Sequence, residues 1–249
     1  MIDIHAHILP GVDDGSPSLA SSLEMARLAV ESGVTAMVAT PHCNLPDSGE
    51  PLWADALTHR EQALSETLAE EGIGLTLYAG MEIFGTPDTP EKLRDGRLCT
   101  LAASRYPLIE FPFHDYGDEA TDILERVLAM GLRPIVAHPE RYRYTQAEPR
   151  LLNLWVDMGC LLQVNRGSLL GRFGAREEAL GHSLIERGFA AFVASDAHTS
   201  VVRTPWMRDV QELLRREYSP RTAQMLLQEH AEQVLCNKAI EMDEPDWFD

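Results

Sequence analysis

Seven short apolar runs, spread along the whole 249-residue chain, limit most strongly how it can fold. They consist mainly of Val, Ile, Leu and Ala, and polar and apolar residues do not alternate within them. This composition is typical of parallel strands whose two faces are both covered by other elements. We therefore expect seven buried strands, at residues 2–4, 34–40, 75–80, 106–111, 133–137, 160–165 and 189–195.

Helical patterns fill the intervals between these runs. The first of them has Ser16 as a candidate N-cap, Pro17 at the first helical position and Gly33 as its end. Its apolar face would carry Leu19, Leu23, Ala26, Ala29 and Val30. The same reasoning predicts helices near 53–71, 119–130, 148–158 and 176–187, and two more between 205 and 239.

The order of these elements is strand then helix, repeated, with no Pro/Ser-rich linker and no block of charge to divide the chain. βα barrels routinely reach this length as one domain. We therefore predict an α/β fold with a single domain, a distorted (β/α)7 barrel with C-terminal helices over residues 1–239. Residues 240–249 are expected to be an acidic and loose tail.

Charge and cysteine usage restrict the class of protein. The chain has 21 Lys and Arg residues against 39 Asp and Glu residues, a formal charge of -18, so nucleic acid is disfavoured as a partner. The four cysteines form no CxxC pair, and neither a disulfide framework nor a zinc ribbon is indicated. Because no leader pattern and no apolar run of about 20 residues is present, we expect a cytoplasmic protein that does not itself span a membrane. The oligomeric state is not indicated.

Polar residues stand at the carboxyl end of every predicted strand, which is where βα barrels carry out their chemistry. In chain order they are His5, His7 and Asp14, then His42, Glu82, Glu110, His138 with Arg141, Asn165, and finally Asp196 with His198. Any one of them alone could be a hydrogen-bonding loop residue or one half of an ion pair. Several histidines and carboxylates that converge on one mouth favour a metal site instead.

Carboxylates crowded into a mouth of low dielectric constant repel one another by several kcal/mol, and bound cations remove that cost. Nine candidate ligands offer nitrogen or oxygen, and none is a cysteine. This donor set suits more than one ion of the Mn, Fe or Zn kind. The HxH pair at 5–7 would then direct two imidazoles into one metal site, and the following turn would bring Asp14 to a neighbouring ion.

The motifs HxH, PH, a glutamate after the third strand, AHPER and SDAH resemble the polymerase-and-histidinol-phosphatase (PHP) superfamily of metal-dependent phosphoesterases. Within it, MIDIHAHILPGVDDG, ATPHC, LIEFP, AHPERY and LQVNRGSLLG look like the bacterial PHP-type protein-tyrosine phosphatases associated with capsule and exopolysaccharide synthesis. The resemblance covers residues 1 to about 205. One departure is SDAHT, where SDxHN is the expected pattern; it leaves the candidate ligands intact.

The resemblance implies three divalent ions, Mn above all, with Fe or Zn as alternatives. A first ion would be held by His5, His7, Glu82 and Asp196, a second by Glu82, Glu110 and His138, and a third by Asp14, His42 and His198. Arg141 and Arg203 match the family's phosphate-contacting arginines. The implied substrate is phosphotyrosine on a protein, and the implied partner is the tyrosine-rich tail of a bacterial tyrosine kinase.

Other interpretations remain open at this stage. A histidinol phosphatase or another small-molecule phosphoesterase would use the same metal chemistry. An amidohydrolase barrel also uses HxH, although its carbamylated-lysine form is excluded because Lys92 and Lys238 lie away from the strand ends. A catalytically inactive barrel that binds a kinase is a further class. Cys99 to Arg105 and Cys160 to Arg166 match the C-x5-R spacing of thiol-based phosphatases, but neither segment has the glycine-rich phosphate cradle of those enzymes, so we interpret both as chance matches.

Overall fold

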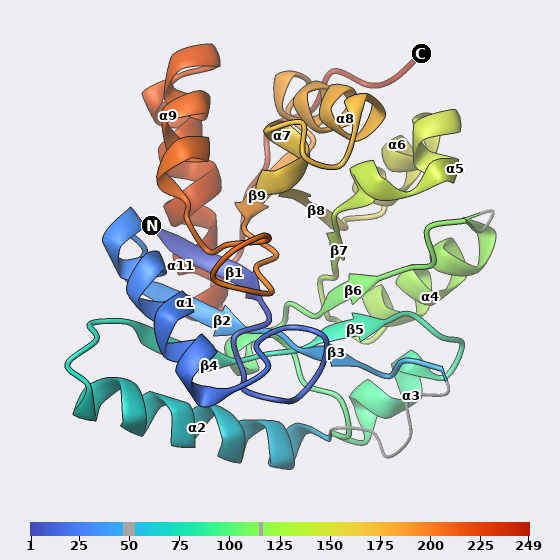
Figure 1. Ribbon diagram of the computed structural model, residues 1–249. Coiled ribbons are helices and arrows are strands. Elements are labelled where there is room, and N and C mark those ends of the chain that lie inside the picture. Colours follow the sequence, from blue (N-terminus) through green and yellow to red (C-terminus); the bar gives the residue numbers. More distant parts are fainter. Residues whose placement is uncertain (47–52, 115–116) are drawn as a thin grey trace.

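The computed structural model describes residues 1–46, 53–114 and 117–249, and it contains all seven predicted strands (Figure 1). These are β1 (Ile2–Ala6), β2 (Ala36–Ala39), β4 (Thr76–Ala79), β6 (Leu108–Glu110), β7 (Ile135–Ala137), β8 (Leu161–Asn165) and β9 (Ala190–Ala194). Every strand pair is parallel. Two further short strands, β3 (His42–Cys43) and β5 (Glu82–Phe84), were not predicted.

The two additional strands arise because the second and third runs are interrupted. β2 ends before Pro41, which has no N–H to donate to a neighbouring strand, and the chain resumes as β3. The third run is interrupted in the same way between β4 and β5. The strands consequently form one sheet in the order β1-β2-β4 and another in the order β3-β5-β6-β7-β8-β9.

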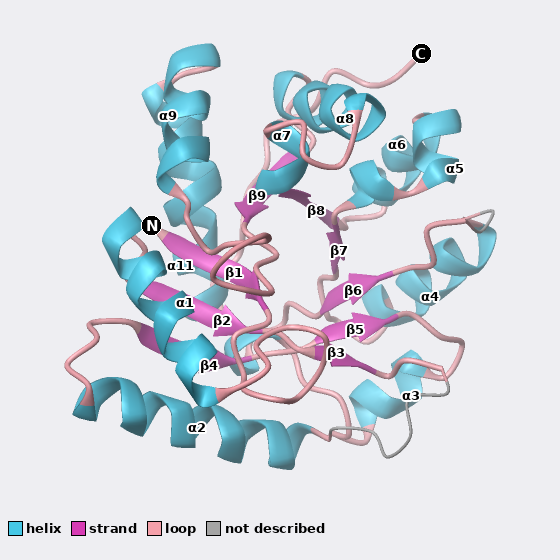
Figure 2. Ribbon diagram, viewed as in Figure 1, coloured by secondary structure: helices cyan, strands magenta, loops and turns pink. Residues whose placement is uncertain are grey.

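The last strand returns to the first, as the ring of strands in Figure 2 shows. Just beyond β9, the backbone N–H of Asp196 donates to the carbonyl of His5 at 2.9 Å, and His7 N–H donates to the carbonyl of Ala197 at 2.8 Å. The seven strand segments therefore follow one another around the molecule in chain order. This is the distorted seven-stranded βα barrel that the sequence predicts.

Helices cover the outside of the ring (Figures 1 and 2). The longer ones are α1 (Leu19–Ser32), α2 (Ala54–Glu70), α4 (Asp118–Leu128), α6 (Arg150–Asp157), α8 (Ala175–Glu186) and α9 (Arg208–Glu217). The second helix of the C-terminal stretch is composed of α10 (Pro220–Gln224), η3 (Met225–Glu229) and α11 (His230–Leu235). The short helical segments α3 (Thr89–Arg94), η1 (Leu101–Ala103), η2 (Pro139–Arg141), α5 (Arg143–Ala147) and α7 (Arg166–Leu169) were not predicted.

The predicted start of the first helix is wrong by two residues. Ser18, not Ser16, is the N-cap, and its side chain accepts a hydrogen bond from the backbone N–H of Ser21 at 3.3 Å. Ser16 is buried, and its hydroxyl lies 2.8 Å from that of Ser22. Two serines two residues apart offered the same local signal, and the packing of the loop before the helix decided between them.

Six of the seven predicted strands are buried along their whole length, which explains why their sequences lack alternation, whereas β4 has an exposed residue, Thr76. Within β7, Val136 belongs to the apolar cluster beneath the helices, whereas Ile135 and Ala137 belong to a second cluster with residues of the other strands and of α11. None of the helices in the described ranges combines the length and apolarity that a membrane span needs.

The expectation of a loose tail is wrong for its last residues. The backbone N–H of Phe248 donates to Asn153 of α6 at 3.1 Å, and the side-chain amide of Asn153 donates back to the Phe248 carbonyl at 2.9 Å. The rings of Trp247 and Phe248 lie 5.8 and 5.0 Å from the ring of Phe189. Aromatic burial against α6 and the start of β9 outweighs the acidic composition of this segment.

Candidate metal centre

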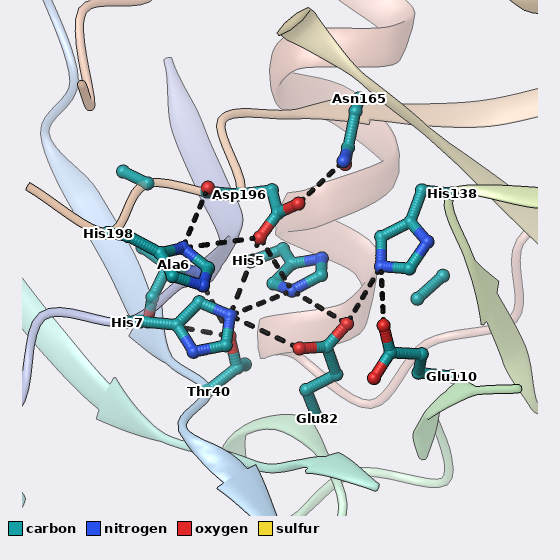
Figure 3. A network of polar contacts seen from close by, with 12 residues as sticks. His5, Ala6, His7, Thr40, Glu82, Glu110, His138, Asn165, Asp196 and His198 are labelled. Atoms are coloured by element: carbon teal, nitrogen blue, oxygen red, sulfur yellow. Dashed lines mark hydrogen bonds and ion pairs between the residues drawn. The ribbon is translucent and has the colours of Figure 1, made fainter. Parts of the chain in front are cut away.

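The nine candidate ligands meet at the mouth of the barrel, at the carboxyl ends of the strands (Figure 3 labels seven of them). They form four overlapping groups, and within each group the potential ligand atoms all lie within 4.8 Å of one another. The groups are His7 with Asp14, His42 and His198; His5 with His7 and Asp196; His5 with Glu82 and His138; and His42 with Glu82 and Glu110. Residues separated by up to 193 positions, from His5 to His198, are thus brought to one place.

Glu82 lies at the centre of this arrangement. Its Oε1 is 3.2 Å from Nε2 of His5 and 2.9 Å from Nε2 of His138. Its Oε2 is 3.2 Å from Nε2 of His7 and 2.9 Å from Nδ1 of His42. One buried carboxylate therefore faces four imidazoles. The sequence had placed Glu82 in a loop after the third strand, but it begins the short strand β5, whose register beside β3 places it next to His42.

Asp196 is the second buried carboxylate of the centre. Its Oδ1 is 3.5 Å from Nε2 of both His5 and His7. Its Oδ2 accepts a hydrogen bond from the side-chain amide of Asn165 at 2.6 Å and pairs with the guanidinium of Arg203. One carboxylate oxygen is therefore held by side chains of the barrel, and the other is directed at the histidines.

Asp14 forms the exposed side of the centre. Its side chain is 67% exposed, and its Oδ1 lies 3.5 Å from Nε2 of His42 and 3.3 Å from Nε2 of His198. Glu110 stands opposite, at the end of β6, with its Oε2 3.6 Å from Nδ1 of His42 and its Oε1 3.5 Å from Nε2 of His138. All the predicted candidates therefore take part in the cluster.

Two side chains that the sequence did not single out orient His5 at the end of β1 and His7 just after it. Nδ1 of His7 lies 2.6 Å from Oδ2 of Asp13, and Nδ1 of His5 lies 2.8 Å from Oε1 of Gln163. An amide oxygen or carboxylate accepts the Nδ1 proton, so Nε2 of each ring is left as the lone-pair donor. Gln163 in turn donates to Asn165 at 2.8 Å, which joins His5 to Asp196 through β8. Gln163 and Asn165 are two positions apart on β8, so their side chains lie on the same face of the strand.

The turn DDG after β1 has a defined role in this network. Besides His7, Asp13 accepts from the backbone N–H of His42 and of Gly15, both at 2.9 Å. A Cβ atom on Gly15 would lie 2.4 Å from the carbonyl oxygen of His7, so only glycine permits the turn to pass this close. Asp13 thus fixes both histidine-bearing segments, and Asp14 next to it faces the cluster.

Two of the candidate ligands have a backbone conformation that L-residues rarely adopt. The φ angle of His138 is 34° and that of Asp196 is 51°, both in the left-handed region. Such strain is maintained only where the surrounding structure compensates for it, and it concentrates at functional sites. This conformation directs the two side chains toward Glu82 and His5.

The pKa values at the centre depart from their ordinary range in both directions. Burial disfavours the charged form of His7, but the carboxylates of Asp13, Asp196 and Glu82 outweigh it and raise the pKa well above that of a free histidine. Burial lowers the pKa of His138 to about 4. Burial and the neighbouring Glu82 raise the pKa of Glu110 to about 8. Without metal ions, His7 and Glu110 therefore hold their protons to higher pH than free side chains do, whereas His138 stays neutral and keeps a lone pair.

The donor set fits divalent metal ions. Oε2 of Glu82 and Oδ1 of Asp196 are buried and complete no hydrogen bond with the described residues, although imidazole nitrogens lie 2.9 to 3.5 Å from them. Leaving buried charged oxygens without a donor is costly, and a cation satisfies them. Imidazole nitrogens and carboxylate oxygens without thiolate are the ligands preferred by Mn, Fe and Zn. The two lysines lie elsewhere: Nζ of Lys92 pairs with Asp88 at 2.8 Å, and Lys238 follows α11.

Arg141 and Arg203 stand beside the centre. Nη1 of Arg141 is 3.3 Å from Oδ2 of Asp196, the oxygen to which Arg203 also binds. The Nη1 atom of Arg203 lies 3.1 Å from Nε2 of His198. Both guanidinium groups are therefore close enough to contact an anion that binds at the cluster.

The cysteines that match C-x5-R do not form a thiol phosphatase site. Burial raises the pKa of Cys99 to about 11 and that of Cys160 to about 12, so neither is a thiolate at neutral pH. The arginines of both matches are engaged elsewhere. Nε of Arg105 donates to Asn237 at 3.1 Å, and Nε of Arg166 donates to Asp209 at 2.7 Å.

Comparison with known proteins places these features in a family. The family model described as "Capsular polysaccharide synthesis, CpsB/CapC" matches residues 1–236. The tyrosine-protein phosphatase YwqE of Bacillus subtilis is 37% identical over 241 residues, which are 96% of this chain and 93% of YwqE. The tyrosine-protein phosphatase CpsB of Streptococcus pneumoniae is 29% identical over 245 residues, 96% of this chain and 100% of CpsB.

Solved structures agree with these matches. A crystal structure from work on YwqE of Bacillus subtilis and CpsB of Streptococcus pneumoniae, described as unique metal-dependent tyrosine phosphatases, superposes with a TM-score of 0.94 at 35% identity and covers 100% of both chains. The phosphotriesterase homology protein of Escherichia coli superposes with a TM-score of 0.58 at 13% identity and covers 94% of this chain and 98% of that one. The second likeness concerns the fold alone.

Proposed function

The chain belongs to the CpsB/CapC family of capsular polysaccharide synthesis proteins, and on this basis we propose that it is a metal-dependent protein-tyrosine phosphatase. The observation that carries the proposal is the convergence of five histidines and four carboxylates at the barrel mouth, without a thiolate. Its substrate is a tyrosine-phosphorylated protein, and its process is capsule or exopolysaccharide synthesis.

For the metal centre we propose three divalent ions, with Mn as the first choice and Fe or Zn as alternatives. His5, His7, Glu82 and Asp196 would hold one ion, Glu82, Glu110 and His138 a second, and Asp14, His42 and His198 a third. Two of the four groups of ligand atoms support the first and third ions, and for the second, Nε2 of His138 lies 2.9 Å from Glu82 and 3.5 Å from Glu110. The groups also suggest that His7 helps to hold the third ion, since its ring lies 3.9 Å from that of His198.

The proposed chemistry needs no covalent intermediate on the protein. Ions of this kind lower the pKa of water to yield a hydroxide nucleophile, and they neutralise phosphate charge. Arg141 and Arg203 would bind the phosphate oxygens, because a guanidinium presents two donors that match two oxygens. The leaving tyrosinate has a pKa near ~10, so it needs less protonation than an alkoxide.

The identity of the phosphorylated partner is a further part of the proposal. We propose the tyrosine-rich tail of a bacterial tyrosine kinase, which the phosphatase names of the relatives and their link to capsule synthesis support. A cytoplasmic location agrees with four free cysteines, two of which are buried.

The test compares substrates on metal-stripped protein to which Mn is added back. A phosphotyrosine peptide and histidinol phosphate are offered to the wild type and to a Cys99→Ser, Cys160→Ser double variant. Metal-dependent release of phosphate from the peptide, equal in both proteins, is expected. Preference for histidinol phosphate would assign the centre to a small-molecule phosphatase, and activity that survives chelation but is lost with the cysteines would overturn the proposal. A protein that binds a phosphorylated kinase and hydrolyses nothing would be an inactive binding barrel.

A further inference from the structure

A pocket of about 500 Å³ opens beside Arg141, outside the cluster of nine ligand-type residues. Its walls come from segments that follow three consecutive strands, β6, β7 and β8. Arg143 is the first residue of α5, and Arg176 lies in the first turn of α8. Figure 1 shows α5 and α8 on the same side of the mouth. The pocket adjoins the metal centre through Arg141, whose Nη1 is 3.3 Å from Asp196.

Two phenylalanines hold the arginine shared by the pocket and the centre. The Cζ atom of Arg141 lies 4.7 Å from the ring centroid of Phe113 and 4.5 Å from that of Phe173. Contacts of this kind between a guanidinium and aromatic faces restrain its orientation. A Cβ atom on Gly167 would lie 2.6 Å from the ring of Phe173, so the glycine of the NRGSLLG motif makes room for this ring. The wall nearest the metal centre is therefore rigid and aromatic.

The other walls carry positive charge that no ion pair within residues 1–46, 53–114 and 117–249 neutralises. Arg143 and Arg176 are exposed, and no carboxylate of the described residues forms an ion pair with either. The acid among the described residues of the pocket is Glu177, whose carboxylate accepts a hydrogen bond from Gln146 at 3.1 Å. Arg141 pairs with Asp196, so Arg143 and Arg176 are the two guanidinium groups of the pocket without an ion pair among the described residues, in a chain whose formal charge is -18.

We propose that this pocket is a subsite for an anionic side chain of the substrate, close to the phosphotyrosine that is hydrolysed. The inference rests on the proposed phosphatase function, because a phosphotyrosine bound at the metal centre brings its neighbouring residues past Arg141. Arg143 and Arg176 then determine specificity by attracting a negative group on the same peptide. A carboxylate and a second phosphate share this chemistry, and the substrate series separates them.

The test uses four peptides with one central phosphotyrosine and Mn-loaded full-length protein. The flanking residues are alanine, glutamate, a second phosphotyrosine or lysine, and kcat and KM are measured for each. Partly exposed charge pairs change binding about two- to fivefold each. We expect the acidic peptides to have the lower KM and to lose this advantage at high salt. If the glutamate and phosphotyrosine peptides both have a lower KM than the alanine peptide, the pocket recognises negative charge in general. If only the second phosphotyrosine lowers KM, the occupant of the pocket is a second phosphorylated residue.

The variants Arg143→Gln and Arg176→Gln test the assignment to these walls. Each is expected to reduce the ratio of kcat/KM for the glutamate peptide over that for the alanine peptide about two- to fivefold, through KM. Arg60→Gln on α2 removes the same charge from an exposed arginine outside the pocket and should leave the ratio unaltered. Arg176→Glu should shift the preference toward the lysine peptide.

A wrong subsite and a wrong phosphatase function would give different results in these assays. If the wild type hydrolyses all four peptides with equal KM, or if Arg60→Gln alters the ratio as much as the pocket variants do, the subsite is overturned and the phosphatase function stands. If the wild type releases no phosphate from any of the four peptides, the proposed function itself is wrong, and the subsite is overturned with it.

Discussion

The metal centre has an inner cluster, formed by His5, Glu82 and His138, and a rim cluster, formed by Asp14, His42 and His198. The inner side chains are at most 1% exposed, whereas in the rim cluster Asp14 is 67% exposed, His42 17% and His198 5%. Water can solvate the charges of the rim but not those of the inner cluster. The inner ligands therefore depend on cations, and we expect the rim to bind its ion more weakly and to exchange it faster.

The largest effect is expected from Glu82→Gln, which removes the charge that faces four imidazoles while keeping the shape of the side chain. Loss of the ions held there should decrease turnover about 10³-fold, a cost of several kcal/mol. Metal content by mass spectrometry and hydrolysis of a phosphotyrosine peptide measure this. Arg141→Ala is the matched control. It removes a charged side chain that contacts Asp196 but is not a candidate ligand, so turnover should fall while the metal content stays the same. A fully metal-loaded Glu82→Gln protein would contradict the role of the inner cluster.

A smaller effect is expected from Asp14→Asn at the rim. Water can take the place of one exposed oxygen, so affinity for one ion should fall about 10- to 100-fold while the inner ions remain. Mn titration followed by metal analysis should give one ion fewer at low Mn, and activity should recover as Mn is raised. If Asp14→Asn loses all its metal at once, the two clusters form a single cooperative site and the distinction between them is wrong.

A still smaller loss of metal affinity is expected from Asp13→Asn, because Asp13 supports His7 without being a candidate ligand itself. In Asp13→Asn an amide oxygen can still accept the Nδ1 proton of His7, but the negative charge is lost, so metal affinity should fall about tenfold. Calorimetric Mn titration gives the affinity, and thermal unfolding in chelator reports whether the fold is kept. Asp13→Ala should bind Mn more weakly than Asp13→Asn does. Equal affinities in both variants would mean that only the negative charge of Asp13 matters, since Asn keeps a hydrogen-bond acceptor that Ala lacks.

Protons should compete with the metal ions. In the metal-free protein the pKa values of His7 and His42 are raised, because burial is outweighed by nearby carboxylates, so both hold their protons to higher pH than free histidine. A metal ion needs the lone pair, and apparent affinity should therefore rise with pH, by at most about tenfold per unit for each proton displaced. Calorimetry in buffers of different ionisation enthalpy counts the protons. Affinity that is independent of pH would show that these nitrogens are not ligands.

Local patterns in the sequence were sufficient to predict much of this protein. Apolar runs without alternation identified seven parallel strands, since a strand buried on both faces needs apolar side chains on both. The rule that barrels act at the carboxyl ends of strands then selected His5, His42, His138 and the other candidate ligands. Each of these inferences depends on residues that are adjacent in the chain or repeat with a short period.

Only the tertiary structure determined how these residues meet. The interruptions after β2 and β4 place Glu82 on its own strand, facing four imidazoles, and no local pattern encodes that register. Gln163 supports His5 across 158 residues, and Phe173 holds Arg141 from a separate loop. The aromatic end of the tail packs on Phe189 despite its acidic composition. The sequence specifies which side chains stand at the end of each strand, but their partners depend on the register and return of the sheet, which arise from packing of the whole chain at once.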